Sequence, residues 1–179
     1  MHPSTWSSPA RVLIYSTDLD AAMASIARVL RAGGRVSAFE PLWLFFDQAK
    51  TPNEFFGREM SGCEVEIAAV MAGYREDLKS TLDNPLTAES LVAAAEAAGL
   101  GSIRATVEVE SRNLPAGDDV AVELALHGRP NPNTCSPAEM AARVLPPRQA
   151  SRFLDTMEES IRAGRGRVRT AAVYLSAPR

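Results

Sequence analysis

The sequence is short of the features that mark several large classes of protein. It has only two cysteines, Cys63 and Cys135, in 179 residues, which excludes a disulfide-rich scaffold and fits a reducing compartment. Aromatic residues make up 6% of the chain. No hydrophobic run approaches the ~20 residues that span a bilayer, and Met1 opens no signal peptide. We therefore expect a cytoplasmic protein without a membrane partner.

Charge of either sign is also not in excess. The sequence has 19 Lys and Arg residues against 22 Asp and Glu residues, for a formal net charge of −3. This balance argues against a nucleic-acid partner held by bulk charge. The arginines are scattered, apart from a dense group at Arg165, Arg167 and Arg169. His2 and His127 have no Cys or carboxylate at ligand spacing, so we predict no metal site.

The clearest local pattern lies in residues 19–41. Apolar residues recur there at the spacing of one helix face, at Leu19, Ala22, Met23, Ile26, Val29 and Leu30. Gly33-Gly34 predicts the end of this helix, because glycine adopts the left-handed conformation without a Cβ clash. Residues 35–39 indicate a buried strand, which Pro41 is predicted to end. A helix that leads into a buried strand is half of a βαβ crossover in a parallel sheet.

The same stretch is similar to one protein family. ARVLRAGGRVSAFEP, residues 27–41, closely resembles a segment of the class I S-adenosylmethionine (SAM)-dependent methyltransferases. There it joins the helix after the fourth strand to the fifth strand. The usual turn in that family is Leu-Arg-Pro-Gly-Gly-Arg, from which Ala32 departs mildly. Residues 12–23 resemble the entry to that helix, and a looser similarity continues to the C-terminus.

The resemblance implies a fold class. It is α/β: the C-terminal portion of a Rossmann-like methyltransferase domain, with a mostly parallel sheet, an antiparallel edge pair formed by the last two strands, and flanking helices. We expect one partial domain over residues 1–179, in which residues 1–10 are unmatched and disordered and residues 11–179 are methyltransferase-like. The family's glycine-rich SAM loop has no counterpart, so we expect an N-terminally truncated chain.

Periodicity and turn residues predict the remaining elements. Helices are expected over residues 64–78, over residues 86–99 with Thr87 as the N-cap, and from Pro147 to Gly164. Alternation predicts a strand with one buried face near residues 103–110, and a final strand covers residues 168–175. Residues 118–126 fit either a helix or a strand, and residues 128–137 are expected to form a loop.

The resemblance also implies where SAM would bind. Arg11, Val12 and Tyr15 fall at or next to positions that line the methionine side of SAM in the family. An alternative interpretation is that Val12 and Tyr15 only pack against the following helix. No residue is identified as catalytic.

Three residues after the predicted fifth strand are candidates for substrate contact. Glu40 and Pro41 lie where open α/β sheets place ligands, outside the carboxyl ends of the strands, and Trp43 follows them. For Glu40, an exposed or capping role is the alternative. Trp43 belongs to an aromatic group that could wall an apolar pocket or form core or uncovered interface, together with Phe45, Phe46, Phe55 and Phe56.

One further motif has two interpretations. Gly164-Arg165-Gly166-Arg167 could form an anion-binding nest, or could simply end a helix and turn the chain.

The resemblance implies transfer of a methyl group from SAM, the expected cofactor, to a small-molecule acceptor. Positioning would supply much of the acceleration. The acceptor would be enclosed by the segment after the fifth strand and by the segments between the last strands. The alternative function is a non-catalytic methyltransferase remnant that serves as an interaction or dimerisation module. Its partner would be a second copy of the chain or a missing N-terminal half.

Overall fold

The computed structural model describes residues 13–42, 51–79 and 85–179. The chain divides into two compact units. Unit 1 takes its residues from Met1–Trp43, Asn84–Val109 and Thr170–Arg179, whereas unit 2 takes its residues from Leu44–Asp83 and Glu110–Arg169. Both units are therefore built from separate pieces of the chain.

Helix α1 (Leu19–Val29) confirms the helix predicted at the start of the clearest stretch. Asp18 is its N-cap, and the carboxylate accepts a hydrogen bond of 2.8 Å from the backbone N–H of Ala21. Met23 of the predicted stripe is buried, as is Ala27 outside it, whereas Val29 of the stripe is 70% exposed. The local sequence therefore predicts the start of this helix, but the buried face coincides only in part with the predicted stripe.

The turn after α1 differs slightly from the prediction. The helix ends at Val29, before the two glycines. Gly33 has a φ of 75°, in the left-handed region, and the N–H of Gly34 donates to the carbonyl of Arg31 at 2.8 Å. The two glycines thus make a separate tight turn, which leads directly into strand β1 (Arg35–Leu42).

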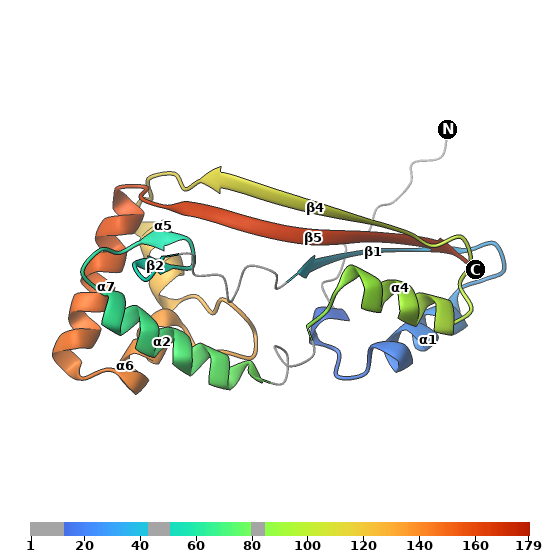
Figure 1. Ribbon diagram of the computed structural model, residues 1–179, viewed down its shortest axis with the longest axis horizontal. Helices are drawn as coiled ribbons and strands as arrows, with labels where there is room; N and C mark the ends of the chain where they lie inside the picture. Colours follow the sequence, from blue (N-terminus) through green and yellow to red (C-terminus); the bar gives the residue numbers. More distant parts are fainter. Residues whose placement is uncertain (1–12, 43–50, 80–84) are drawn as a thin grey trace. The chain divides into compact units, whose positions relative to one another are not determined.

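The main sheet has three strands, β1, β5 (Arg167–Pro178) and β4 (Arg104–Asn113), in the order β1-β5-β4 (Figure 1). β1 and β5 run antiparallel, from the pair Arg35 and Pro178 to the pair Leu42 and Ala171. The predicted mostly parallel, Rossmann-like sheet is therefore wrong, since the three strands are antiparallel. A βαβ crossover needs a strand before its helix. Before α1, the described chain instead holds a short 3-10 helix, η1 (Leu13–Tyr15).

The prediction that Pro41 ends the strand is also wrong. β1 continues through Pro41 to Leu42, and these two residues lie opposite Ala172 and Ala171 of β5. β1 is at an edge of the sheet. There a residue without a backbone N–H is tolerated, because its nitrogen can face away from the neighbouring strand.

Strand β4 is present where alternation predicts it, but it is not buried on one face. All of its residues except Ala105 are exposed, and the exposed fractions of Val107 and Val109 are 46% and 60%. β4 occupies the second edge of the sheet and has one neighbouring strand, β5. Alternation therefore correctly indicates the pleat of a strand, but it does not indicate that a second layer covers it.

Helix α4 (Ala88–Ala97) confirms the prediction that Thr87 starts a helix. The Thr87 hydroxyl accepts a hydrogen bond from the backbone N–H of Ser90, the Ser90 hydroxyl accepts one from the N–H of Thr87, and both distances are 3.0 Å. α4 packs against α1 within unit 1. Its buried residues are Leu91, Ala94 and Ala95.

The described helices of unit 2 are α2 (Glu64–Asp77), α5 (Asp119–His127), α6 (Pro137–Val144) and α7 (Pro147–Arg162). α2 and α7 confirm the predicted helices. α5 settles the ambiguous segment as a helix with Asp118 as the N-cap. The four helices surround one core, whose largest fully buried members are Tyr74, Phe55, Phe153, Met60, Met140 and Ile161.

Helix α6 lies partly within a segment predicted as loop. It begins with a capping box, in which the Ser136 hydroxyl accepts from the N–H of Glu139 and the Glu139 carboxylate accepts from the N–H of Ser136. Pro137 occupies the first turn, where a proline is favoured. The motif Ser-Pro-x-Glu was therefore a readable start signal, which the prolines of the preceding loop obscured.

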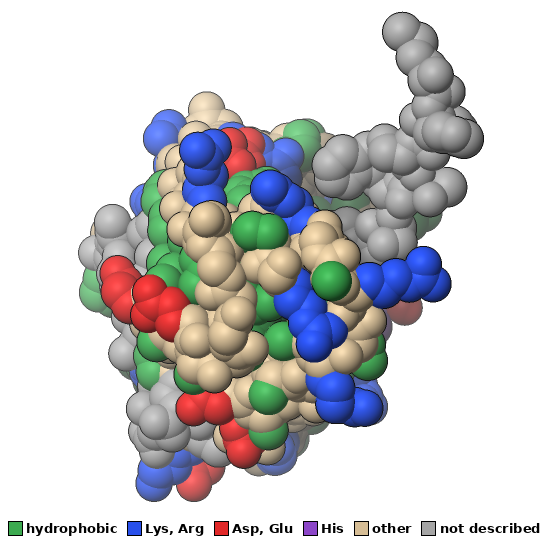
Figure 2. All heavy atoms as spheres, turned by 90° about the vertical axis from the view of Figure 1, so that its right-hand side faces the viewer, with side chains coloured by type: hydrophobic (Ala, Val, Ile, Leu, Met, Phe, Trp, Pro, Cys, Tyr) green, Lys and Arg blue, Asp and Glu red, His purple; other side chains and the backbone are tan. Residues whose placement is uncertain are grey.

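Within the described residues, no helix is both long and apolar enough to cross a membrane. Figure 2 shows one face of the molecule, on which Lys and Arg side chains are separated from one another by apolar and uncharged surface. On this face the positive charge is dispersed, in agreement with the scatter of the arginines along the sequence.

Candidate functional site

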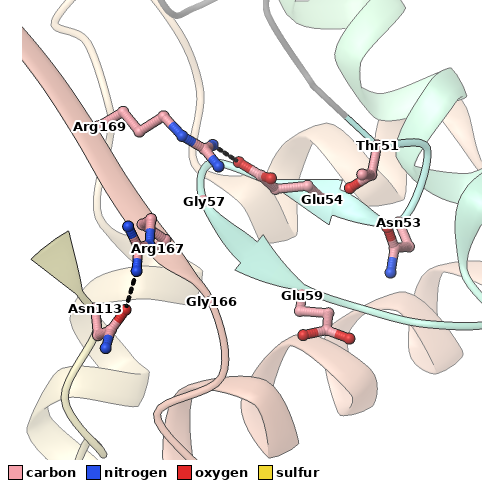
Figure 3. A pocket seen from close by; sticks show the side chains of 9 residues that line it. All are labelled: Thr51, Asn53, Glu54, Gly57, Glu59, Asn113, Gly166, Arg167 and Arg169. Carbon is pink, nitrogen blue, oxygen red and sulfur yellow. Dashed lines mark hydrogen bonds and ion pairs between the residues drawn. The ribbon is translucent and has the colours of Figure 1, made fainter. Parts of the chain in front are cut away.

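A polar cavity of about 410 Å³ lies within unit 2. Three parts of the chain line it: the segment that holds strands β2 (Glu54–Phe55) and β3 (Arg58–Glu59), the end of β4, and the start of β5 (Figure 3). The volume falls in the range of small-molecule sites, roughly 300–1,000 Å³. The lining residues are Thr51, Asn53, Glu54, Gly57, Glu59, Asn113, Gly166, Arg167 and Arg169.

The hairpin of β2 and β3 forms because its two-residue turn has the required backbone. Phe56 and Gly57 have φ values of 45° and 81°, the left-handed conformation that two-residue hairpin turns favour. The turn brings Glu54 directly opposite Glu59 in the register of the hairpin. Of the residues that line the cavity, the hairpin therefore contributes two carboxylates and no cation.

The hairpin is joined to the start of β5 by backbone contacts. The N–H of Arg167 donates to the carbonyl of Gly57 at 2.7 Å, and Arg58 forms a bridge with Gly166. A Cβ on Gly166 would lie 2.0 Å from the Gly57 carbonyl oxygen, so only glycine permits this approach. The cavity therefore depends on two glycines that let two backbones come close together.

Two arginines of β5 line the cavity, and they have different partners (Figure 3). Arg169 Nη1 lies 2.8 Å from Glu54 Oε1, and the exposed fractions of these side chains are 24% and 18%. Arg167 Nη2 donates to the neutral amide oxygen of Asn113 at 3.0 Å. Thus the charge of Arg169 is neutralised by Glu54, whereas Arg167 is oriented by Asn113 and keeps its positive charge available.

Glu59 is the other charged residue of the cavity. It is exposed, and within the part of the chain that the structure describes its carboxylate has no hydrogen bond or ion pair. Arg58 lies beside it in β3. Burial lowers the pKa of the Arg58 guanidinium, and the Nη1 atom has no hydrogen-bond partner among the described residues. The hairpin therefore concentrates both unpaired negative charge and a partly desolvated cation.

The structure brings two of the predicted site segments together in unit 1. Glu40 is 1% exposed, and its carboxylate oxygens accept hydrogen bonds from the backbone N–H groups of Leu13 at 3.1 Å and Ile14 at 3.2 Å. Tyr15, half-buried, is the next residue of η1. Pro41 lies within β1. In this structure the Glu40 carboxylate contacts the backbone at the start of η1, a capping arrangement.

Other predicted site residues cannot be placed in the same way. Arg11, Val12 and Trp43 lie outside the described residues, as do Phe45 and Phe46.

Phe55 and Phe56 belong to the core of unit 2. Phe55 is fully buried, and its ring centroid lies 4.5 Å from that of Phe56 and 5.1 Å from that of Phe153. Phe56 is partly buried and packs against the same core. Of the two interpretations of these residues, the structure supports core.

Of the predicted SAM and substrate residues that the structure describes, Tyr15, Glu40 and Pro41, none lines the cavity of unit 2. Sequence reasoning missed this site, although two signals pointed toward it. Gly166 and Arg167, considered as part of an anion nest, do line the cavity. The Phe56-Gly57 pair is the second signal, because a residue followed by glycine between short strands is typical of a hairpin turn.

The comparisons identify no family. No known family model matches this chain, and no curated protein matches it. Within the described residues, no group of three or more His, Cys, Asp and Glu side chains could hold a metal ion.

Proposed function

We propose that this chain carries the acceptor side of a SAM-dependent methyltransferase that acts on a small molecule. The observation that carries the proposal is the similarity of residues 27–41 to the family's helix, Gly-Gly turn and strand. In the structure these residues do form the end of a helix, a tight glycine turn and a strand, in α1 and β1.

The organisation of unit 2 supports the same proposal. The resemblance implies that an acceptor is enclosed by the segment after the fifth strand and by the segments between the last strands. Unit 2 combines these two parts of the chain, Leu44–Asp83 and Glu110–Arg169, and holds the polar cavity. A separate unit that contributes acceptor specificity is consistent with positioning as the main source of acceleration in methyl transfer.

The described residues do not fit SAM by themselves. The sequence has no glycine-rich loop after a first strand and no acidic residue after a second strand to hold the ribose. The Glu40 carboxylate, which contacts the backbone just before Tyr15, already accepts two backbone hydrogen bonds. We therefore assign recognition of the acceptor, and not of SAM, to this chain.

This assignment is tested by titrating SAM calorimetrically into the chain alone and into the chain produced with the polypeptide encoded directly upstream of it. We expect no binding by the chain alone even at millimolar SAM. We expect micromolar binding, and transfer of a labelled methyl group, when the upstream polypeptide is present. A folded pair that binds no SAM would overturn the proposal. Micromolar binding of SAM by the chain alone would contradict the conclusion that its residues do not fit SAM by themselves.

The exposed part of the main sheet favours a second candidate function, an interaction or dimerisation module. Phe39 and Tyr174 form a cross-strand ring pair with centroids 4.9 Å apart, and Tyr174 is 45% exposed. On the edge strand β4, Val107 and Val109 are also exposed. Edge strands with exposed apolar side chains tend to pair with another chain.

If the sheet is an interface, the chain will be a dimer in solution, and Val109→Lys will convert it to a monomer. A charge placed on an edge strand blocks further strand pairing. Light scattering coupled to size-exclusion chromatography measures the mass directly. Val65→Lys is the matched control, because Val65 is 71% exposed and lies on α2 rather than on a strand of the sheet. A monomeric unmodified chain would exclude self-association through this sheet.

A further inference from the structure

We propose that the polar cavity of unit 2 binds a small zwitterion that carries one carboxylate and one ammonium group, with free amino acids as the ligand class. As a binding site the proposal stands on the cavity alone. The assignment of this zwitterion as the methyl acceptor rests on the proposed function.

The backbone register places two unlike charges on the same face of the cavity. In the antiparallel bridge between Arg58 and Gly166, Gly57 lies opposite Arg167. Because side chains alternate along a strand, Glu59, Arg165 and Arg167 share a face. Arg165 lies directly opposite Glu59 and pairs with Glu159, outside the cavity lining. Arg167 is the diagonal neighbour of Glu59, with Cα atoms roughly 7–8 Å apart. No ion pair joins Glu59 and Arg167 among the described residues, although both line the cavity. A ligand with two charges of opposite sign can bridge this gap.

The negative side of the site is suited to an ammonium group. Glu54 and Glu59 are directly opposed in the hairpin. In the described part of the chain, one arginine forms an ion pair with either of them: Arg169, which contacts Glu54. One carboxylate therefore remains without a counter-ion among those residues. A ligand ammonium at Glu59 would supply this counter-ion and donate hydrogen bonds to the carboxylate.

The positive side is suited to a carboxylate. Arg167 donates through Nη2 to Asn113, which holds the guanidinium plane, and its other N–H groups have no hydrogen-bond partner within the described ranges. Guanidinium groups bind carboxylates through paired, parallel hydrogen bonds. Thr51 and Asn53 add neutral polar groups to the lining, which suits a ligand with a polar side chain.

The balance of charge in the cavity disfavours other ligand classes. Two arginines and two glutamates leave the lining without net charge. A phosphate or another multiply charged anion would be attracted by Arg167 but repelled by Glu59. A simple cation would be attracted by Glu59 but repelled by Arg167. The arrangement therefore distinguishes a zwitterion from an ion of either sign.

The test is ligand-observed NMR on the full chain, with a panel of proteinogenic L-amino acids as the probe at millimolar concentration. For the amino acid that binds most tightly, two analogues are then compared, one without the carboxylate and one without the amine. We expect each analogue to bind at least about tenfold more weakly, which corresponds to the loss of one ionic contact of about 1.4 kcal/mol. Equal binding of either analogue would overturn the assignment.

Variants connect each charge of the ligand to one residue. Glu59→Gln should weaken binding of the amino acid about tenfold and leave binding of the analogue without an amine unchanged. Arg167→Gln should also weaken binding of the amino acid about tenfold, but leave binding of the analogue without a carboxylate unchanged. Glu158→Gln and Arg162→Gln are matched controls, because these residues pair with each other on α7 and do not line the cavity. If both site variants affected both analogues equally, or if no amino acid bound the folded chain, the proposal would be wrong.

These outcomes separate the ligand from the reaction. If amino acids bind but no methyl group is transferred in the presence of the upstream polypeptide, the proposed function is wrong and the proposed binding site is supported. If a methyl group is transferred to an acceptor that is not zwitterionic and no amino acid binds, the ligand assignment is wrong and the proposed function is supported.

Discussion

Replacing Gly166 with alanine is expected to lower the free energy of unfolding of unit 2 by about 3 kcal/mol or more. Gly166 has a φ of 121°, which an L side chain rarely adopts, and an added Cβ would lie 2.0 Å from the Gly57 carbonyl oxygen and 3.0 Å from Arg58 Cα. Both of these are backbone atoms, so the clash can be relieved only by separating the hairpin from β5. Urea denaturation followed by circular dichroism measures the loss.

A second measurement shows where the damage lies. Hydrogen exchange of the Arg167 amide, which donates to the Gly57 carbonyl at 2.7 Å, should accelerate in the Gly166→Ala variant, while amides of α7 remain protected. Gly62→Ala is the matched control, because Gly62 also has a positive φ, 85°, but a Cβ added there would meet nothing within 4 Å. If the two variants lost equal stability, the positive φ of Gly166, rather than its close approach to Gly57, would explain why glycine is required at this position.

Replacing Glu40 with alanine is the second large effect, with an expected loss of about 3 kcal/mol from unit 1. The variant removes the acceptor of two buried hydrogen bonds and leaves the N–H groups of Leu13 and Ile14 without it. An unsatisfied buried donor costs about 1–3 kcal/mol. Glu40→Gln keeps one acceptor oxygen and should lose roughly half as much. Thermal unfolding should show a decrease in Tm of about 6–12 °C for Glu40→Ala.

The Glu40 experiment also tests the prediction that this residue contacts substrate. Glu96→Ala is the control, since Glu96 is exposed on α4 and should change stability by less than about 0.5 kcal/mol. A Glu40→Ala variant as stable as the unmodified chain would show that the two backbone hydrogen bonds are unimportant. If that variant also lost ligand binding, the carboxylate would act on a ligand as the resemblance implies.

Local signals in the sequence were sufficient for most helices. Helix α7 begins at Pro147, and Phe153, Met157 and Ile161 of its predicted stripe are buried. Helix α4 begins after Thr87 through the interaction with Ser90. In each case, the deciding interactions lie within a few residues of one another, so spacing alone contains the information.

The direction of the strands could not be obtained in this way. A strand pattern shows which residues alternate, and it is the same for parallel and antiparallel neighbours. β1 pairs with β5, more than a hundred residues later in the chain. The inference of a parallel sheet from α1 and β1 assumed a preceding strand, which the described residues do not contain.

The cavity of unit 2 was missed for the same reason. Its walls come from residues 51–59, from Asn113 and from residues 166–169. Glu54 and Glu59 can be related through the Phe56-Gly57 turn. Their proximity to Arg167 and Arg169 depends on the bridge between Arg58 and Gly166, which no sequence period records. The nearest available signal in the sequence was a glycine typical of a turn, Gly57, together with a glycine just before a predicted strand, Gly166.

The central position of β5 has a consequence for synthesis of the protein on the ribosome. β5 lies between β1 and β4, yet it is the last of these strands to be translated. Until its residues leave the exit tunnel, β1 and β4 have no strand between them, and their edges are open to chaperones or to other nascent chains. Translation that stalls before Arg167 would therefore release a product in which the sheet cannot form at all, however well the helices have folded.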